Sequence, residues 1–258
     1  MKTPYILSAS VLALALAACG GGSGSADNGP GNGNGNGNGN GNNNGGGGSA
    51  TLPTSLLQGL WQSPAGASPA VSAIVLPDGK MWAAVTTGSS VRVLKAGLSG
   101  QAASFSGRGK SYLLGTSTVT DGSITASVVA KSSLTGTIIP DGGTGEPFSL
   151  AYQARYDTAA TLAQFAGAWR DVQGPGAQNW NITASGALTG TRTTGCTYVG
   201  QLTERPERTA VVDVSMTEDC AGTRVNLQGV ATLNAANGIS MVMTTANDSA
   251  AVALTLSR

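Results

Sequence analysis

Short strand-like runs of Val, Ile, Thr, Ala and Ser fill the chain from Leu52 to Arg258, and long helical periodicity is missing. The runs expected to form strands include Val71–Leu76, Met81–Thr86, Ile124–Val129, Phe148–Tyr156, Val211–Met216, Val225–Leu233, Ile239–Thr245 and Ala251–Leu256. Turn signals separate the runs, namely Pro77-Asp78-Gly79, Asp121-Gly122, Pro140-Asp141-Gly142-Gly143, Asn237-Gly238 and Asn247-Asp248. This spacing predicts an all-β meander.

Two stretches of the chain resemble each other and favour two small units over one large barrel. Leu57–Trp61 aligns with Phe165–Trp169, 108 positions later. Downstream glycines repeat at an offset of 93, which we interpret as about 14 extra residues in the first half, enough for one more hairpin. The predicted fold class is therefore all-β, with two small antiparallel β-barrel or sandwich units after a disordered linker. Their predicted bounds are residues 51–157 and 158–258.

Four glycines are expected inside strands, where a small barrel must bend sharply or let another backbone approach. Gly107 and Gly136 lie 29 residues apart, and Gly200 and Gly229 have the same separation. Each follows a large apolar residue by two positions, so that this residue points to the same face of the strand and fills the interior.

A tryptophan opens each predicted unit, Trp61 in the first and Trp169 in the second. Short helical turns are expected just before them, at Pro53–Gln58 and Thr158–Phe165. The two indole rings either plug one end of a core or line a ligand pocket, and we interpret them as core plugs.

The N-terminal segment has the pattern of an export signal. An apolar run of about 14 residues follows Lys2, which is shorter than the roughly 20 residues that span a bilayer. It ends Leu16-Ala17-Ala18-Cys19-Gly20, which resembles the lipobox of bacterial lipoproteins. The resemblance implies that residues 1–18 are a signal peptide, cleaved before Cys19, and that acyl chains such as palmitate are attached to Cys19. The alternative is an ordinary signal peptide in which Cys19 is incidental.

Residues 19–50 comprise the cysteine and a linker that is almost wholly Gly, Asn and Ser. We expect the linker to be disordered, because it has no apolar surface to offset its ordering entropy. Two or more acyl chains on one residue give stable anchoring. Gly20 stands where an aspartate would imply retention at the inner membrane, so the resemblance implies lipid anchoring at the outer membrane of a Gram-negative cell. The periplasmic and surface sides both stay open.

Two cysteines remain besides Cys19, and they permit a single pairing, Cys196 with Cys220. Export places them in an oxidising compartment, where such pairs tend to form disulfides. The alternatives are a reactive thiol or a metal site, but two cysteines without histidine make a poor zinc site. We therefore predict a structural disulfide and no metal.

Charge and composition narrow the function classes. Charged residues make up 10% of the chain, and removal of Lys2 with the signal leaves thirteen basic and thirteen acidic residues. Such a balance gives no field to attract nucleic acid. Histidine is absent, which excludes Ser-His-Asp and Cys-His catalysis. Turn chemistry accounts for the acids Asp78, Asp121, Asp141 and Glu146. We predict no catalytic residues and no cofactor.

The folded part resembles uncharacterised two-domain, β-rich lipoproteins of proteobacteria. The resemblance rests on the Gly-x-Trp openings, the Pro77-Asp78-Gly79 turn and the run Gly195–Gly200, and it implies no chemistry. We therefore predict a non-catalytic binding or display module for a small apolar ligand, a host protein or another envelope protein. The alternative is a structural or inhibitory envelope component without a ligand pocket. An apolar cavity with convergent polar groups would distinguish the two.

Overall fold

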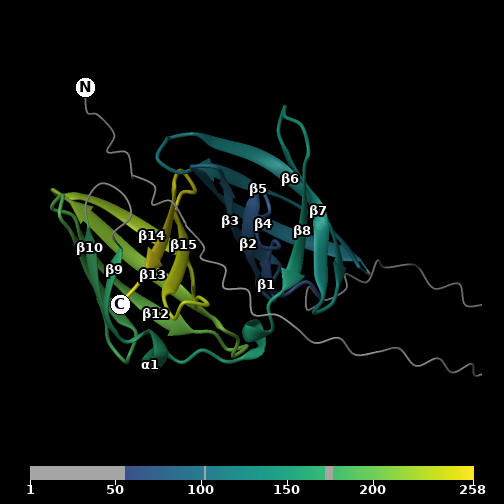
Figure 1. The fold of residues 1–258 in the computed structure, drawn as a ribbon. Coiled ribbons are helices and arrows are strands. Elements are labelled where there is room, and N and C mark those ends of the chain that lie inside the picture. The colour runs from purple at the N-terminus through teal and green to yellow at the C-terminus, as the bar shows by residue number, and fades with distance from the viewer. Residues whose placement is uncertain (1–55, 102, 172–176) are drawn as a thin grey trace, which may run out of the picture.

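The computed structural model describes residues 56–101, 103–171 and 177–258. It confirms the all-β fold class: the chain forms two eight-stranded antiparallel sheets, the first closed into a barrel and the second curled into a barrel-like sheet, here called the second barrel (Figure 1). The predicted signal peptide, residues 1–18, and the segment with Cys19 and the linker, residues 19–50, lie outside the described residues.

The first barrel is an up-and-down meander in which each strand pairs with the next. Its strands are β1 (Gly59–Gln62), β2 (Ala70–Val75), β3 (Lys80–Thr87), β4 (Ser90–Gln101), β5 (Ser104–Leu113), β6 (Val119–Val129), β7 (Ser133–Pro140) and β8 (Glu146–Tyr152). Pairing of β1 with β8, at Trp61 with Tyr152 and Gln62 with Ala151, closes the barrel.

The second barrel repeats this simple order. Its strands are β9 (Gly167–Asp171), β10 (Gln178–Ile182), β11 (Ala187–Arg192), β12 (Thr197–Glu204), β13 (Val211–Cys220), β14 (Thr223–Leu233), β15 (Ile239–Thr245) and β16 (Ala251–Leu256). The edge strands β9 and β16 meet at a bridge between Arg170 and Ser257, whose backbone N–H groups donate to each other's carbonyls at 2.8 and 2.9 Å. A 3-10 turn, η2 (Ala154–Asp157), and a short helix, α1 (Leu162–Phe165), connect the barrels.

The two tryptophans are core plugs, as interpreted from the sequence. Trp61 and Trp169 are both buried, each in its own barrel's apolar core. The indole N–H of Trp61 donates to the carbonyl of Leu57 at 3.0 Å, and that of Trp169 donates to the carbonyl of Phe165 at 2.8 Å. The openings of the two barrels are therefore equivalent in geometry as well as in sequence.

The in-strand glycines sit where neighbouring strands approach closely. A Cβ added at Gly107, Gly136, Gly200 or Gly229 would lie 1.9 to 2.4 Å from a carbonyl oxygen of the adjacent strand. These positions are nevertheless not equivalent between barrels, because Gly107 lies on the fifth strand of the first barrel and Gly200 on the fourth strand of the second. The expected extra hairpin is thus wrong: both barrels have eight strands, and the offset changes because the repeated glycines lie on strands of different rank in the two barrels.

One predicted turn is also wrong. Asp121-Gly122 lies inside β6, where Gly122 pairs with Gly109 on one side and Pro140 on the other. A Cβ at Gly122 would lie 2.8 Å from the Ile139 carbonyl oxygen, so this glycine serves close strand packing. Pairing on both sides outweighs the local turn preference of an Asp-Gly pair.

The two barrels lie side by side (Figure 1). A third apolar cluster packs between them. The first barrel and η2 contribute Leu60, Ile74, Leu76, Trp82, Val93, Tyr112 and Tyr156, and the second contributes Val211, Val230, Val242, Ala251 and Ala253. All of these side chains are buried. Parts of the outer faces of β1–β4 and β13–β16 therefore cover one another.

Candidate functional site

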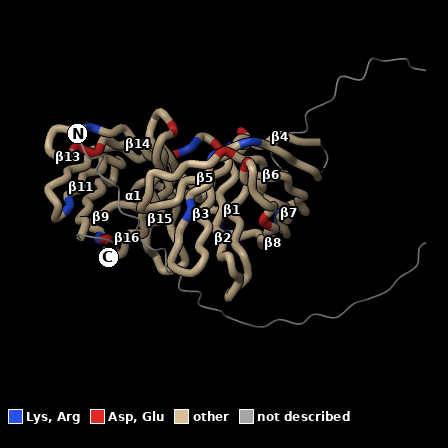
Figure 2. Tube along the Cα trace, turned by 90° about the horizontal axis from the view of Figure 1, so that it is seen from above, with Lys and Arg blue, Asp and Glu red and all other residues tan. Residues whose placement is uncertain are grey.

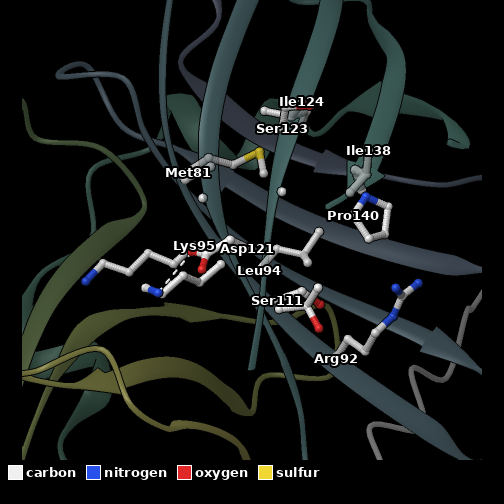
Figure 3. A pocket seen from close by; sticks show the side chains of 15 residues that line it. Met81, Arg92, Leu94, Lys95, Ser111, Asp121, Ser123, Ile124, Ile138 and Pro140 are labelled. Carbon is white, nitrogen blue, oxygen red and sulfur yellow. Dashed lines mark hydrogen bonds and ion pairs between the residues drawn. The ribbon is translucent and has the colours of Figure 1, made fainter. Parts of the chain in front are cut away.

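The interior of the first barrel is nearly full. A hollow at one end has a volume of about 30 Å³ and lies among Met81, Leu94, Ile124 and Ile138 (Figure 3). A water molecule needs roughly 10–15 Å³ of such space, so one or two waters fit and an apolar ligand of ordinary size does not. The ion pair between Arg92 and Glu146 and that between Lys110 and Asp121, at 3.0 Å, lie around this end.

The interior of the second barrel is also filled, but one end of it is polar. The side chains concerned, here called the polar end, are Asp171, Gln178, Arg192, Tyr198 and Glu218. They lie at one end of β9 to β13, and Tyr198 also belongs to the apolar core that they adjoin. The adjoining hollow has a volume of about 20 Å³, which is room for a water molecule.

A short hydrogen-bond chain organises the polar end. The Tyr198 hydroxyl donates to a Glu218 carboxylate oxygen at 2.8 Å. Burial raises the pKa of Tyr198, the charge of Glu218 and this hydrogen bond raise it further, and nearby Arg192 acts in the opposite direction. The Gln178 Oε1 and Trp180 Nε1 atoms are buried without a hydrogen-bond partner in the described part of the chain. A water in the adjoining hollow is the simplest partner for the Gln178 oxygen.

Cys196 and Cys220 form a disulfide next to the polar end. Their sulfur atoms and a Glu218 oxygen lie within 4.8 Å of one another. Disulfide sulfurs are not thiolates, and thiolates are the form in which cysteine binds zinc. The arrangement is therefore that of a covalent staple across the β12–β13 hairpin.

The larger candidate site lies between the barrels. This inter-barrel groove has a volume of about 410 Å³, within the range of small-ligand sites, and such sites often lie at domain interfaces. β3, β4 and the β2–β3 turn form one wall, and β12–β15 form the other. The side chains that reach it from the first barrel are Asp78, Lys80, Trp82 and Lys95, and those from the second include Arg205, Asp213, Ser215 and Gln228.

Ion pairs shape the base of the groove. Lys95 Nζ lies 2.6 Å from Asp248 Oδ1 of the other barrel and donates to the Thr244 hydroxyl at 3.2 Å. The same ammonium lies 5.1 Å from the centroid of the Trp82 ring, a cation–π contact. The barrels are thus joined by charge as well as by apolar packing.

The electrostatic field of the second barrel extends across the groove. Burial acts to raise the pKa of Asp78, but hydrogen bonds from Lys80 and the charges of Lys80 and Arg205 outweigh it and hold this pKa below its usual value. Arg205 pairs in turn with Asp213. Figure 2 shows basic and acidic residues interspersed along the described part of the chain. The groove therefore presents paired charges of both signs.

Two uncharged polar groups on the groove wall are available to a ligand. Ser215 and Gln228 are exposed, lie opposite each other on β13 and β14, and make no hydrogen bond within the part of the chain that the structure describes. A hydroxyl and an amide together offer both donors and acceptors. The groove thus combines free polar groups with a hollow large enough for a ligand, whereas the hollows in the barrel interiors have room for water only.

The four acids singled out in the sequence are all ion-paired. Their partners are Lys80 for Asp78, Lys110 for Asp121, Arg108 for Asp141 and Arg92 for Glu146. Turn chemistry alone therefore does not account for them. Sequence reasoning missed the buried carboxylates Asp171 and Glu218. The signal for Glu218 was available, because alternation along β13 places it on the same face as buried Val214 and Met216.

No known family model matches this sequence, and no curated protein or solved structure was found to match it. Among the described residues, no helix has the length and apolar character of a membrane span. The predicted lipidation site, Cys19, lies outside the described residues.

Proposed function

We propose that this chain is a lipid-anchored lipoprotein of the bacterial outer membrane whose paired barrels form a non-catalytic binding module, with the inter-barrel groove as its binding surface. The observation that carries the proposal is the contrast between the filled barrel interiors and the groove of about 410 Å³. The hollows inside the barrels are too small for a ligand. The groove is large enough, and it offers the hydroxyl of Ser215 and the amide of Gln228 for hydrogen bonds. Its paired charges favour a polar partner, such as an exposed segment of another envelope protein or host protein, over a small apolar ligand.

The anchor is supported by the sequence Leu16-Ala17-Ala18-Cys19. In cells producing the Cys19→Ser variant, we expect the protein to leave the membrane fraction, because the acyl chains are the proposed attachment. Fractionation after a salt wash measures this. Retention of the variant in the membrane pellet would show that another contact holds the protein.

Photocrosslinking in intact cells tests the binding surface. A photoreactive amino acid at Gln228 stands in the groove, and one at Asn181 stands on the exposed outer face of β10 as a matched control. We expect a discrete crosslinked adduct from position 228 and none of the same mass from position 181. Equal adducts from both positions, or none from position 228, would contradict the groove assignment.

A structural or inhibitory component without a ligand site is the second candidate. The observation in its favour is that every charged side chain lining the groove already has an ion-pair partner. If these ion pairs are the whole role of the charged side chains, the groove joins the two barrels and binds no partner. The absence of any adduct from position 228 would favour this candidate.

A further inference from the structure

A second surface hollow lies away from the groove, on the outer face of the first barrel. It spans β5, β6, β7 and the end of β4, and it has a volume of about 630 Å³. Six hydroxyl side chains line it, and we call it the hydroxyl trough: Ser104, Ser106, Thr125, Ser127, Thr135 and Thr137. The trough shares no lining residue with the inter-barrel groove, so the inference drawn from it stands independently of the proposed function.

The six hydroxyls form a regular grid because of the strand register. Ser106 pairs with Thr125 and Thr125 with Thr137, while Ser104 pairs with Ser127 and Ser127 with Thr135. Neighbouring strands are about 4.8 Å apart, and residues two positions apart along a strand are separated by about 6.8 Å. The grid therefore has two rows of three hydroxyls at these spacings.

All six side chains point outward, because the residues between them point inward. Phe105 and Ala126 are buried in the barrel core, and Gly136 lies in the same row. Five of the six hydroxyl residues are exposed and Thr137 is half-buried. None of the six makes a side-chain hydrogen bond within the described part of the chain, so each can still donate one hydrogen bond and accept others.

The composition of the trough restricts the class of ligand. No charged side chain is among its described lining residues, so it offers no counter-ion to a phosphate, carboxylate or ammonium group. Its large apolar residue, Phe105, is buried beneath the strands and offers little surface to a lipid tail. What it presents is a set of hydroxyls with threonine methyl groups between them and the amide of Gln101 at one end.

We propose that the hydroxyl trough binds a neutral oligosaccharide. Sugar hydroxyls need both donors and acceptors, which serine and threonine supply together. The C–H faces of sugar rings can pack against the threonine methyl groups. The volume of about 630 Å³ lies within the range of natural ligand sites and accommodates a chain of a few sugar rings.

Calorimetric titration of the full chain in detergent tests the proposal. The probes are three neutral hexasaccharides, made of α-1,4-glucose, β-1,4-glucose and mannose, with a galacturonate hexasaccharide as the charged comparison. We expect at least one neutral probe to bind with a Kd of about 1 mM or tighter, and the charged probe to bind at least tenfold more weakly.

A hydroxyl-deletion variant localises the binding. Thr125→Val, Thr135→Val and Thr137→Val together keep side-chain shape and strand preference, and they should weaken binding of the neutral probe at least tenfold. The matched control, Thr189→Val, Thr191→Val and Thr197→Val, removes three exposed hydroxyls from the second barrel and should leave binding unchanged. Should the first variant misfold, Ser104→Ala with Ser127→Ala replaces it. Absence of binding by every neutral probe, equal binding of the charged probe, or unchanged binding in the trough variants would overturn the proposal.

Discussion

Gly136 illustrates how single residues shape the barrel walls. A Cβ at this position would lie 2.1 Å from the Thr125 carbonyl oxygen and 2.6 Å from the ring of Phe148 on the next strand. The ring of Phe148 thus covers the space that a side chain would occupy. In this way an aromatic residue on a neighbouring strand makes up for the missing side chain of a glycine. The same relation holds between Gly190 and Trp180 in the second barrel.

Replacing Gly136 with alanine should therefore destabilise the protein by about 1–3 kcal/mol, since strand or ring must move to admit the methyl group. The control is Gly97→Ala, because a Cβ at Gly97 meets nothing within 4 Å. That change should alter stability by no more than about 0.5 kcal/mol. Urea unfolding measures both, and equal effects would contradict the account of the glycines.

Protonation of Asp248 should make the stability of the protein depend on pH. Burial acts to raise its pKa, but hydrogen bonds from Lys95 and Thr244 and the charge of Lys95 outweigh it, so the folded-state pKa lies below the usual value. A depressed carboxyl pKa adds stability above the unfolded-state pKa, and this is lost as pH falls through the folded-state pKa.

Lowering the pH from about 5 to about 2 should therefore weaken the contact between barrels. The Asp248→Asn variant should lose less stability over that interval than the unmodified protein. Lys95→Met should have a similar effect, and the double variant should show a non-additive change, because both substitutions remove the same ion pair. Parallel pH profiles for variant and unmodified protein would show that the pair carries no stability.

Among the elements, the hairpin of β12 and β13 combines strand pairing with a covalent link. Thr197 pairs with Asp219, so the flanking Cys196 and Cys220 lie side by side and form the disulfide. The sequence predicted this bond by elimination, since the expected lipidation of Cys19 leaves two cysteines, and the expected export places them in an oxidising compartment.

Replacement of both cysteines by serine should lower the free energy of unfolding by about 3 kcal/mol, because 24 residues separate Cys196 from Cys220 and the bond restricts the unfolded chain. Urea unfolding of the two forms measures the difference. Mass spectrometry of a non-reduced digest should show the linked peptides in protein isolated from the envelope. Two free thiols in that material would contradict the assignment.

The elements also show how far sequence reasoning reaches. The all-β class and the Trp61 and Trp169 plugs could be predicted, because composition, turn residues and local spacing encode them. The strand at Asp121-Gly122 could not, because pairing with two distant segments decides it. The groove could not either, because it brings Lys95 beside Asp248, 153 positions away along the chain. Contacts of that kind depend on how the barrels dock, and the sequence pattern within a short segment does not predict docking.

For the whole molecule, the shared apolar cluster should make the two barrels unfold together. Val230 is 1% exposed and lies in that cluster, whereas Val199 is 64% exposed on the outer face of the second barrel. Burying an unpaired charge between the barrels is strongly unfavourable, and the same charge in water is not.

Calorimetry should therefore show one unfolding transition for the unmodified protein and for Val199→Asp. Val230→Asp should separate the barrels and give two transitions, or one at a temperature lower by several degrees. Two transitions in the unmodified protein would show that the barrels fold independently and that the cluster does not couple them.

We also propose that the protein as a whole has no catalytic activity, and this can be tested. Histidine is absent from the sequence, and the buried carboxylates Asp171 and Glu218 are the strongest remaining candidates for acid or base chemistry. We expect no turnover of chromogenic ester, glycoside, phosphate or peptide substrates above background. Turnover that disappears in Glu218→Gln or Asp171→Asn would contradict the proposal.

The central claim is that a polar partner, such as an exposed segment of another protein, binds in the inter-barrel groove. The most direct measurement places a photoreactive amino acid at Thr203, in the groove. This change is combined either with Ser215→Trp, which puts a large side chain into the groove, or with Thr189→Trp on the outer face of β11. We predict that Ser215→Trp reduces the crosslinked adduct at least tenfold and that Thr189→Trp leaves it unchanged. An adduct that persists in Ser215→Trp, or that is lost equally in Thr189→Trp, would contradict the claim.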